Sequence, residues 1–87
     1  MEESVEETLK RIVLKITRKK NVNYSSKTRF EDLNADSLDK VQILVKLEET
    51  YDIELPDDEV RRVVDMGGFV DLIKSKIAEK AQKQGSN

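Results

Sequence analysis

The stretch of sequence that decides the fold is Phe30-Glu31-Asp32-Leu33-Asn34-Ala35-Asp36-Ser37-Leu38-Asp39-Lys40-Val41. A helix begins inside it, because an Asp or Ser directly before a periodic apolar run can accept hydrogen bonds from the unpartnered N–H groups of a first helical turn. Ser37 is therefore predicted to lie at a helix N-terminus. The free N–H groups and the positive end of the helix dipole favour an anion there, so a phosphate esterified to Ser37 would be stabilised.

On position alone, two interpretations of this serine are open: Asp36 or Ser37 serves only as the helix cap, or Ser37 carries an anionic group. The wider sequence favours the second. It contains, in order, Phe30-x-x-Leu33, Ala35-Asp36-Ser37-Leu38-Asp39, Leu47-Glu48-Glu49-Thr50-Tyr51 and Ile53-Glu54-Leu55-Pro56-Asp57. With these segments at matching spacing, the chain resembles the acyl carrier protein family, continuously from about Phe30 to Glu59 and more loosely from Val5 to Lys80.

The resemblance implies a prosthetic group. In that family the serine of an Asp-Ser-Leu motif carries 4′-phosphopantetheine, and Ser37 is the residue that matches, with Asp36 and Leu38 beside it. A phosphopantetheinyl transferase is then expected to move the group from coenzyme A to Ser37. Acyl groups would travel on its thiol as thioesters between acyl-transferring, condensing or ligase enzymes, in fatty-acid synthesis or in a specialised lipid or secondary-metabolite pathway.

The composition agrees with a protein that enzymes act upon. Its 87 residues are enough for one small domain, and 37% hydrophobic against 39% charged residues predicts a thin aliphatic core under a charged surface. The chain has no cysteine and no histidine, which removes disulfides, cysteine-based zinc sites and the most frequent general base. We therefore expect no catalysis by Ser37, and any thiol must come from an attached cofactor.

Helical spacing of the apolar residues predicts an all-α fold, a small four-helix bundle with three longer helices and one short third helix. The expected helices span Val5–Arg18, Ser37–Tyr51, a brief segment from Pro56 to Arg62, and a last helix that Asp65 caps and that runs from Met66 through Ile77. A long loop joins the first two, anchored by Val22, Tyr24, Phe30 and Leu33. One domain is expected over residues 1–87, ordered from about 4 to 80, with residues 81–87 as a frayed tail.

The second helix carries two apolar stripes. Ile43, Leu44, Leu47 and Tyr51 fall around one direction, and Leu38, Val41 and Val45 fall around another. Either the long loop covers the second stripe, or the stripe is exposed for partners. By resemblance to the family, the docking positions are Asp36, Leu38, Asp39, Val41, Val45, Glu48 and Glu49. An interior bounded by Ile43, Leu47, Val63, Phe69 and Ile73 is predicted to receive the acyl chain.

The charge pattern also points to protein partners. Residues 31–60 hold eleven acidic and two basic residues, so the acidic middle should attract basic surfaces, whereas both flanks are basic. The basic second half of the first helix has no interleaved aromatic residues, which favours a solvated face over a nucleic-acid site. Asp32-x-Asn34-x-Asp36 copies the start of a calcium loop but lacks its required Gly and last Glu, where Ser37 and Ile43 stand, so no metal site is expected.

The N-terminus and the lengths of the apolar runs indicate the location of the protein in the cell. The N-terminus lacks a signal peptide and the apolar runs are too short to span a bilayer, which predicts a soluble cytoplasmic protein. We also expect a monomer.

Four residues depart from the family pattern, namely Asn34, Gln42, Arg61 and Arg62. They favour a specialised carrier over a housekeeping one. The alternative from another class is an unmodified helical adaptor that binds a protein partner through Leu38, Val41 and Val45.

Overall fold

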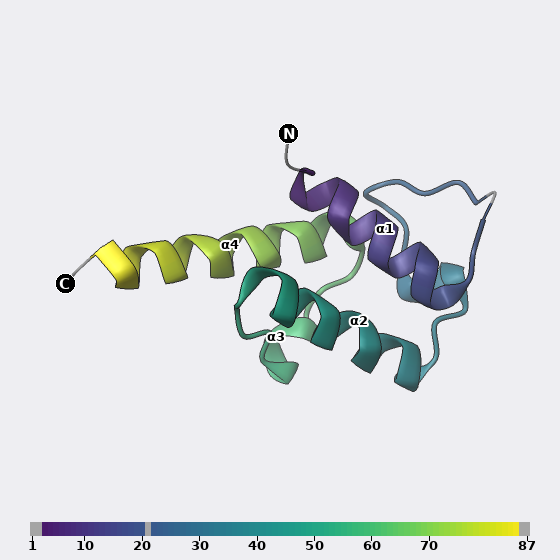
Figure 1. The fold of residues 1–87 in the computed structure, drawn as a ribbon. Helices are drawn as coiled ribbons and strands as arrows, with labels where there is room; N and C mark the ends of the chain where they lie inside the picture. The colour runs from purple at the N-terminus through teal and green to yellow at the C-terminus, as the bar shows by residue number, and fades with distance from the viewer. Residues whose placement is uncertain (1–2, 21, 86–87) are drawn as a thin grey trace.

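The computed structural model describes residues 3–20 and 22–85. Its elements are α1 (Val5–Thr17), the 3₁₀ helix η1 (Phe30–Leu33), α2 (Ser37–Tyr51), α3 (Asp57–Val60) and α4 (Met66–Gly85), and the described residues contain no strand (Figure 1). The all-α prediction of three longer helices, one short third helix and a long first connection is confirmed. None of the helices in residues 3–20 and 22–85 is long and apolar enough to cross a membrane.

The first helix begins and ends by local chemistry. The Ser4 hydroxyl caps it by accepting a hydrogen bond from the Glu7 N–H at 3.1 Å. Arg18 ends it in the left-handed conformation, with φ of 60°, and donates its N–H to the carbonyls of Leu14 and Lys15. The helix therefore stops one residue earlier than predicted. Its buried face consists of Thr8, Leu9, Ile12 and Val13.

The long loop between α1 and α2 is held at several points, only some of which were predicted. Leu33 is buried, and Phe30 packs edge-on against Phe69 with 5.7 Å between ring centroids. Val22 is exposed, so its prediction as an anchor is wrong. Thr28 takes that role, because its buried hydroxyl accepts from the Ser25 N–H at 2.8 Å and fixes a turn.

The last two helices differ from their predicted lengths. α3 covers only Asp57–Val60, after which Arg61 and Arg62 form a turn. α4 continues through Gly85, past Ile77, the last residue of the predicted helical pattern, and its second half projects beyond the other helices (Figure 1). Residues 81–85 are therefore helical in the structure, and fraying of this end stays a prediction. Residues 86–87 lie outside the described residues.

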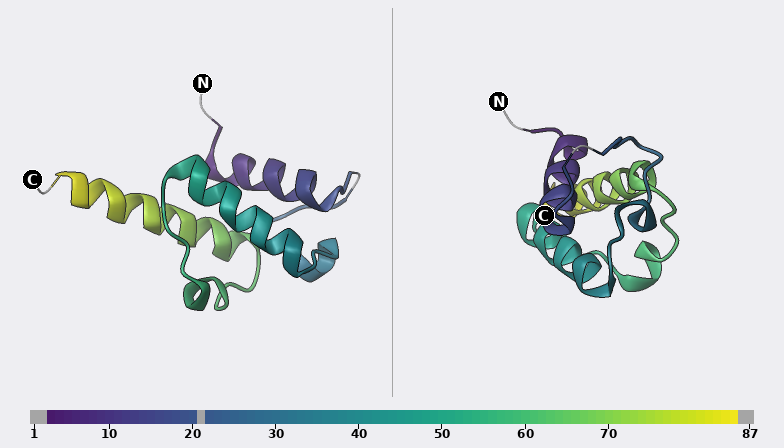
Figure 2. Two further views of the ribbon diagram at one scale, coloured as in Figure 1. Left: turned by 60° about the horizontal axis from the view of Figure 1, so that its bottom comes forward. Right: turned by 90° about the vertical axis from the view of Figure 1, so that its right-hand side faces the viewer.

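The long helices bury one aliphatic core. Viewed end-on in Figure 2, α1, α2 and α3 are arranged around α4. The core residues are Leu9, Ile12, Val13, Leu33, Ile43, Leu47, Ile53, Leu55, Met66, Phe69, Val70 and Ile73. This core fixes the direction in which α2 faces, and so decides which of its side chains reach solvent.

Candidate functional site

The start of α2 divides two tasks between neighbouring residues. The Asp36 carboxylate accepts from the Asp39 N–H at 2.8 Å, and the Asp39 carboxylate accepts from the Asp36 N–H at 3.3 Å. This reciprocal capping box makes Asp36 the cap and Ser37 the first helical residue. Ser37 is exposed, and in the described part of the chain its hydroxyl has no hydrogen-bond partner. The helix therefore does not need the Ser37 hydroxyl for its cap.

The segment that leads to Ser37 explains one departure from the family pattern. Asn34 ends η1 in the left-handed region with φ of 54°, and its N–H donates to the Glu31 carbonyl. Glycine reaches this region without strain, and asparagine is among the few other residues that enter it readily. The Asp32 carboxylate accepts from the Arg29 N–H at 2.9 Å and fixes the beginning of the same turn. Asn34 therefore preserves the turn that a glycine would provide.

The outer stripe of α2 faces solvent. Leu38, Val41 and Val45 are 64%, 54% and 47% exposed, whereas Ile43 and Leu47 are fully buried. The two predicted stripes are thus present, and the long loop does not cover the outer one. Asp36 and Glu49 are exposed and Asp39 is half-buried. An apolar strip with an acidic border is the kind of surface that docks a partner with a basic rim.

Glu48, the remaining residue predicted for docking, has an internal partner. It is half-buried, and its Oε2 accepts a hydrogen bond from the Leu55 N–H at 2.9 Å. This bond ties the end of α2 to the segment that leads into α3. No local pattern in the sequence predicts this bond, because the acceptor and the donor are seven residues apart across a chain reversal.

A groove lies directly beside Ser37. Its volume is about 410 Å³, and it lies between α2 and the α3 region. The lining residues are Phe30, Ser37, Lys40, Val41, Leu44, Asp57, Val60, Arg61 and Val63. Lys40 places its ammonium 5.7 Å from the centroid of the Phe30 ring, and Arg61 pairs with Asp57. The groove is therefore apolar at its base and charged at its mouth.

The predicted acyl-chain cavity is not the same place. Of its five residues only Val63 lines this groove; Ile43, Leu47, Phe69 and Ile73 are each 0% exposed within the core. The 43 and 47 positions of α2 point into the bundle, whereas the groove follows the neighbouring face through Ser37, Lys40, Val41 and Leu44. Helical spacing from Ser37 would have identified that face. A chain that reached the predicted cavity would have to separate packed core residues.

The carboxylates of the partial calcium motif have other partners in the structure. Within residues 3–20 and 22–85, no three Asp or Glu side chains are close enough to hold a metal ion. Asp32 and Asp36, the carboxylates of the partial calcium motif, accept backbone hydrogen bonds from Arg29 and Asp39. These two carboxylates therefore stabilise the starts of η1 and α2.

Comparison with known proteins agrees with this geometry. Residues 7–70 match the model of the family described as "Phosphopantetheine attachment site". The fold is similar to the holo acyl carrier protein from Geobacter metallireducens, with 25% identity over 92% of this chain and 93% of that chain and a TM-score of 0.79. It is also similar to the acetyl actinorhodin acyl carrier protein from Streptomyces coelicolor, with 29% identity over 86% of this chain and 92% of that chain and a TM-score of 0.71.

The fold and these matches define a carrier protein whose prosthetic group is 4′-phosphopantetheine, not a catalytic enzyme. The chain belongs to the phosphopantetheine-attachment family and, within it, to the acyl carrier proteins. Proteins of this kind interact with phosphopantetheinyl transferases and with enzymes that handle acyl groups.

Proposed function

We propose that Ser37 is the attachment site of 4′-phosphopantetheine, and that the loaded chain delivers acyl thioesters to enzymes that dock on α2. One observation carries this proposal. Asp36 caps α2, so Ser37 at the helix N-terminus is exposed and its hydroxyl has no hydrogen-bond partner in the described part of the chain. An unmodified adaptor needs no such hydroxyl. The attached group supplies the thiol that holds the acyl cargo, since the chain has no cysteine of its own.

The residues around Ser37 suit this role. The positive end of the α2 dipole stabilises an anionic phosphodiester at Ser37, and Lys40 adds a positive charge on the same side of the helix. Leu44, Val60 and Val63 offer apolar contact to the first part of an acyl chain. The predicted interior bounded by Ile43, Leu47, Val63, Phe69 and Ile73 is the deeper region that a longer chain would enter by opening the core.

Partners are proposed to dock on the exposed apolar strip of Leu38, Val41 and Val45, with Asp36, Asp39 and Glu49 meeting their basic side chains. Glu48 supports this face by holding the loop after α2. Arg61 at the mouth of the groove and the basic flanks support a carrier for a specialised pathway beside bulk fatty-acid synthesis. Elongation by a housekeeping synthase as fast as on its own carrier would overturn that specialisation.

The test of attachment is the intact mass of the protein after incubation with coenzyme A and a promiscuous phosphopantetheinyl transferase. We expect the wild-type chain to gain one phosphopantetheine and Ser37→Ala to gain none. Ser75→Ala is the matched control, because Ser75 is exposed on α4 and should leave the mass gain intact. No gain by correctly folded wild-type protein would overturn the proposal and favour the unmodified adaptor.

A further inference from the structure

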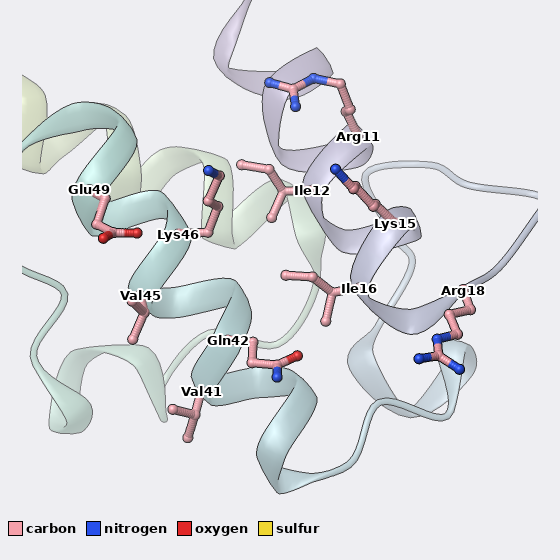
Figure 3. Close-up of a pocket in the computed structure, with 10 residues that line it drawn as sticks. All are labelled: Arg11, Ile12, Lys15, Ile16, Arg18, Val41, Gln42, Val45, Lys46 and Glu49. Carbon is pink, nitrogen blue, oxygen red and sulfur yellow. The ribbon is translucent and has the colours of Figure 1, made fainter.

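A second groove lies between α1 and α2, and it shares Val41 with the groove beside Ser37. Its volume is about 540 Å³. Aliphatic side chains from both helices line it, namely Ile12, Ile16, Val41 and Val45 (Figure 3). Its other lining residues are Arg11, Lys15 and Arg18 on α1 or at its end, and Gln42, Lys46 and Glu49 on α2. The proposed carrier function uses only the α2 side of this groove, through Val41, Val45 and Glu49, and assigns no role to its α1 side.

Three of the four cations around this groove have no ion-pair partner among the described residues. Arg11 pairs with Glu3 at 2.9 Å, but Lys15, Arg18 and Lys46 form no ion pair with any carboxylate in the described part of the chain. On α4, by contrast, Lys74, Lys76 and Lys80 each pair with a carboxylate. Glu49 is the one acidic residue among those that line the groove. The groove is therefore positively charged in a chain whose net charge is −2.

The placement of these cations indicates which kind of ligand the groove between α1 and α2 would bind. Lys15 and Arg18 lie one turn apart on the α1 side, and Lys46 lies on the α2 side. A single fatty-acid carboxylate offers one negative charge to three unpaired cations, and a flat anionic membrane surface would not enter a groove between two helices. An amphipathic helix with an apolar ridge and acidic residues on both sides of it meets all of these features.

We propose that the α1–α2 groove docks an acidic amphipathic helix of a partner protein. This inference rests on the proposed function, because Val41 and Val45 belong both to the groove and to the proposed docking face. A partner would then present two charges of opposite sign, basic side chains to Asp36 and Asp39 and an acidic helix to Lys15, Arg18 and Lys46. Partners with only a basic surface would satisfy half of the interface, so the groove selects among partners.

The test uses the full chain loaded with phosphopantetheine, with loading verified by intact mass before any binding is measured. The probe is a designed, fluorescently labelled helix of about four turns with a leucine ridge flanked by glutamates, and a lysine version of the same peptide is its control. We expect the acidic peptide to bind by fluorescence anisotropy and to shift the NMR signals of Ile12, Ile16, Val41 and Val45. Failure to load Ser37 would be seen first, and separately.

Paired variants distinguish the groove from net charge. Lys15→Glu with Arg18→Glu should weaken binding of the acidic peptide by about tenfold or more, because attraction becomes repulsion at one wall. Lys27→Glu with Arg62→Glu makes the same change in net charge outside the groove and should weaken binding by less than about threefold. Lys15→Gln with Arg18→Gln, a milder change, should give an intermediate loss if the glutamate pair fails to fold by circular dichroism.

Any one of three results would overturn the proposal: no binding of the acidic peptide, equal loss of its binding in both charge-reversed double variants, or shifts of the same groove signals by the lysine peptide. Vesicles that contain phosphatidylglycerol serve as a competitor. If they bind the chain and displace the peptide, the groove recognises an anionic membrane surface, and the proposed helix is wrong.

Discussion

At the scale of single residues, the site depends on which of two adjacent side chains caps α2. Both Asp36 and Ser37 have an oxygen that can accept from a first-turn N–H, so the sequence left the cap undecided. In the structure Asp36 takes the cap and Asp39 completes the box, which leaves Ser37 exposed. Asp36 therefore has two contributions, one to helix stability and one to the charge beside Ser37, and these are separable by substitution.

Asp36→Ala should lower the free energy of unfolding by about 1 kcal/mol, because the Asp39 N–H loses its acceptor. Asp36→Asn should keep nearly wild-type stability, since its amide oxygen can still cap, but should slow phosphopantetheine transfer because a docking charge is lost. Urea unfolding followed by circular dichroism measures the first effect, and the rate of mass gain measures the second. An Asn variant as unstable as the Ala variant would contradict this separation of roles.

At the scale of helices and loops, local patterns were sufficient for some features and insufficient for others. The start of α2 and the N-terminus of α4 were predicted correctly, because cap residues and helical spacing are local signals. The groove beside Ser37, the Thr28 anchor and the Glu48 bond to Leu55 were not predicted. Each depends on which surfaces meet after the chain reverses direction, and no spacing within one segment reports that.

The junction of the long loop with α4 shows such a meeting. The N–H groups of Met66 and Gly67 donate to the Thr28 and Ser26 carbonyls at 2.8 Å and 2.7 Å. A Cβ on Gly67 would lie 3.1 Å from both the Cβ and the carbonyl oxygen of Ser26, which is too close for comfortable packing. Gly67 therefore allows the helix N-terminus to approach the loop backbone. Its neighbour Gly68 is less confined, with its nearest contact at 3.4 Å from the Asp65 carboxylate.

Gly68→Ala is expected to raise the free energy of unfolding by about 0.5–1 kcal/mol, because alanine is the better helix former and the site has room. Gly67→Ala gains the same helix propensity but must displace the Ser26 backbone, so it should be clearly less stable than Gly68→Ala. Thermal and urea unfolding of the two single variants test this ordering. Equal stabilities would show that the loop yields without cost at Gly67.

At the scale of the whole molecule, charge and burial are unevenly distributed. The acidic residues concentrate in residues 31–60, on α2, α3 and the segments that flank them, whereas six basic residues lie on α1 or directly after it, namely Lys10, Arg11, Lys15, Arg18, Lys19 and Lys20. Such separation of charge steers partners toward one face, and salt weakens this steering.

Tyr24 helps to hold the long loop against the bundle. Its side chain is half-buried, and its ring centroid lies 5.6 Å from the Lys10 ammonium. Burial raises the pKa of Tyr24 to about 12.

The raised pKa of Tyr24 predicts a loss of stability at high pH. Between pH 10 and about 12 the unfolded chain has released the Tyr24 proton while the folded chain retains it, so the free energy of unfolding falls as the pH rises. Tyr24→Phe should lack this part of the loss. Urea midpoints at pH 9 and pH 11 should therefore separate further for wild type than for the variant, and equal separations would contradict the assignment.

The capped turn beneath Ser37 has a mechanical meaning as well as a chemical one. Because Asp36 and Asp39 hold the backbone on both sides of Ser37, a group esterified to that serine would be attached at a fixed point. Reach is then set by the arm alone, measured from a single point at the beginning of α2. A partner enzyme would have to dock so that its reaction centre lies within the length of the arm from Ser37. The position of the docking surface relative to Ser37 would therefore limit which enzymes can react with the cargo.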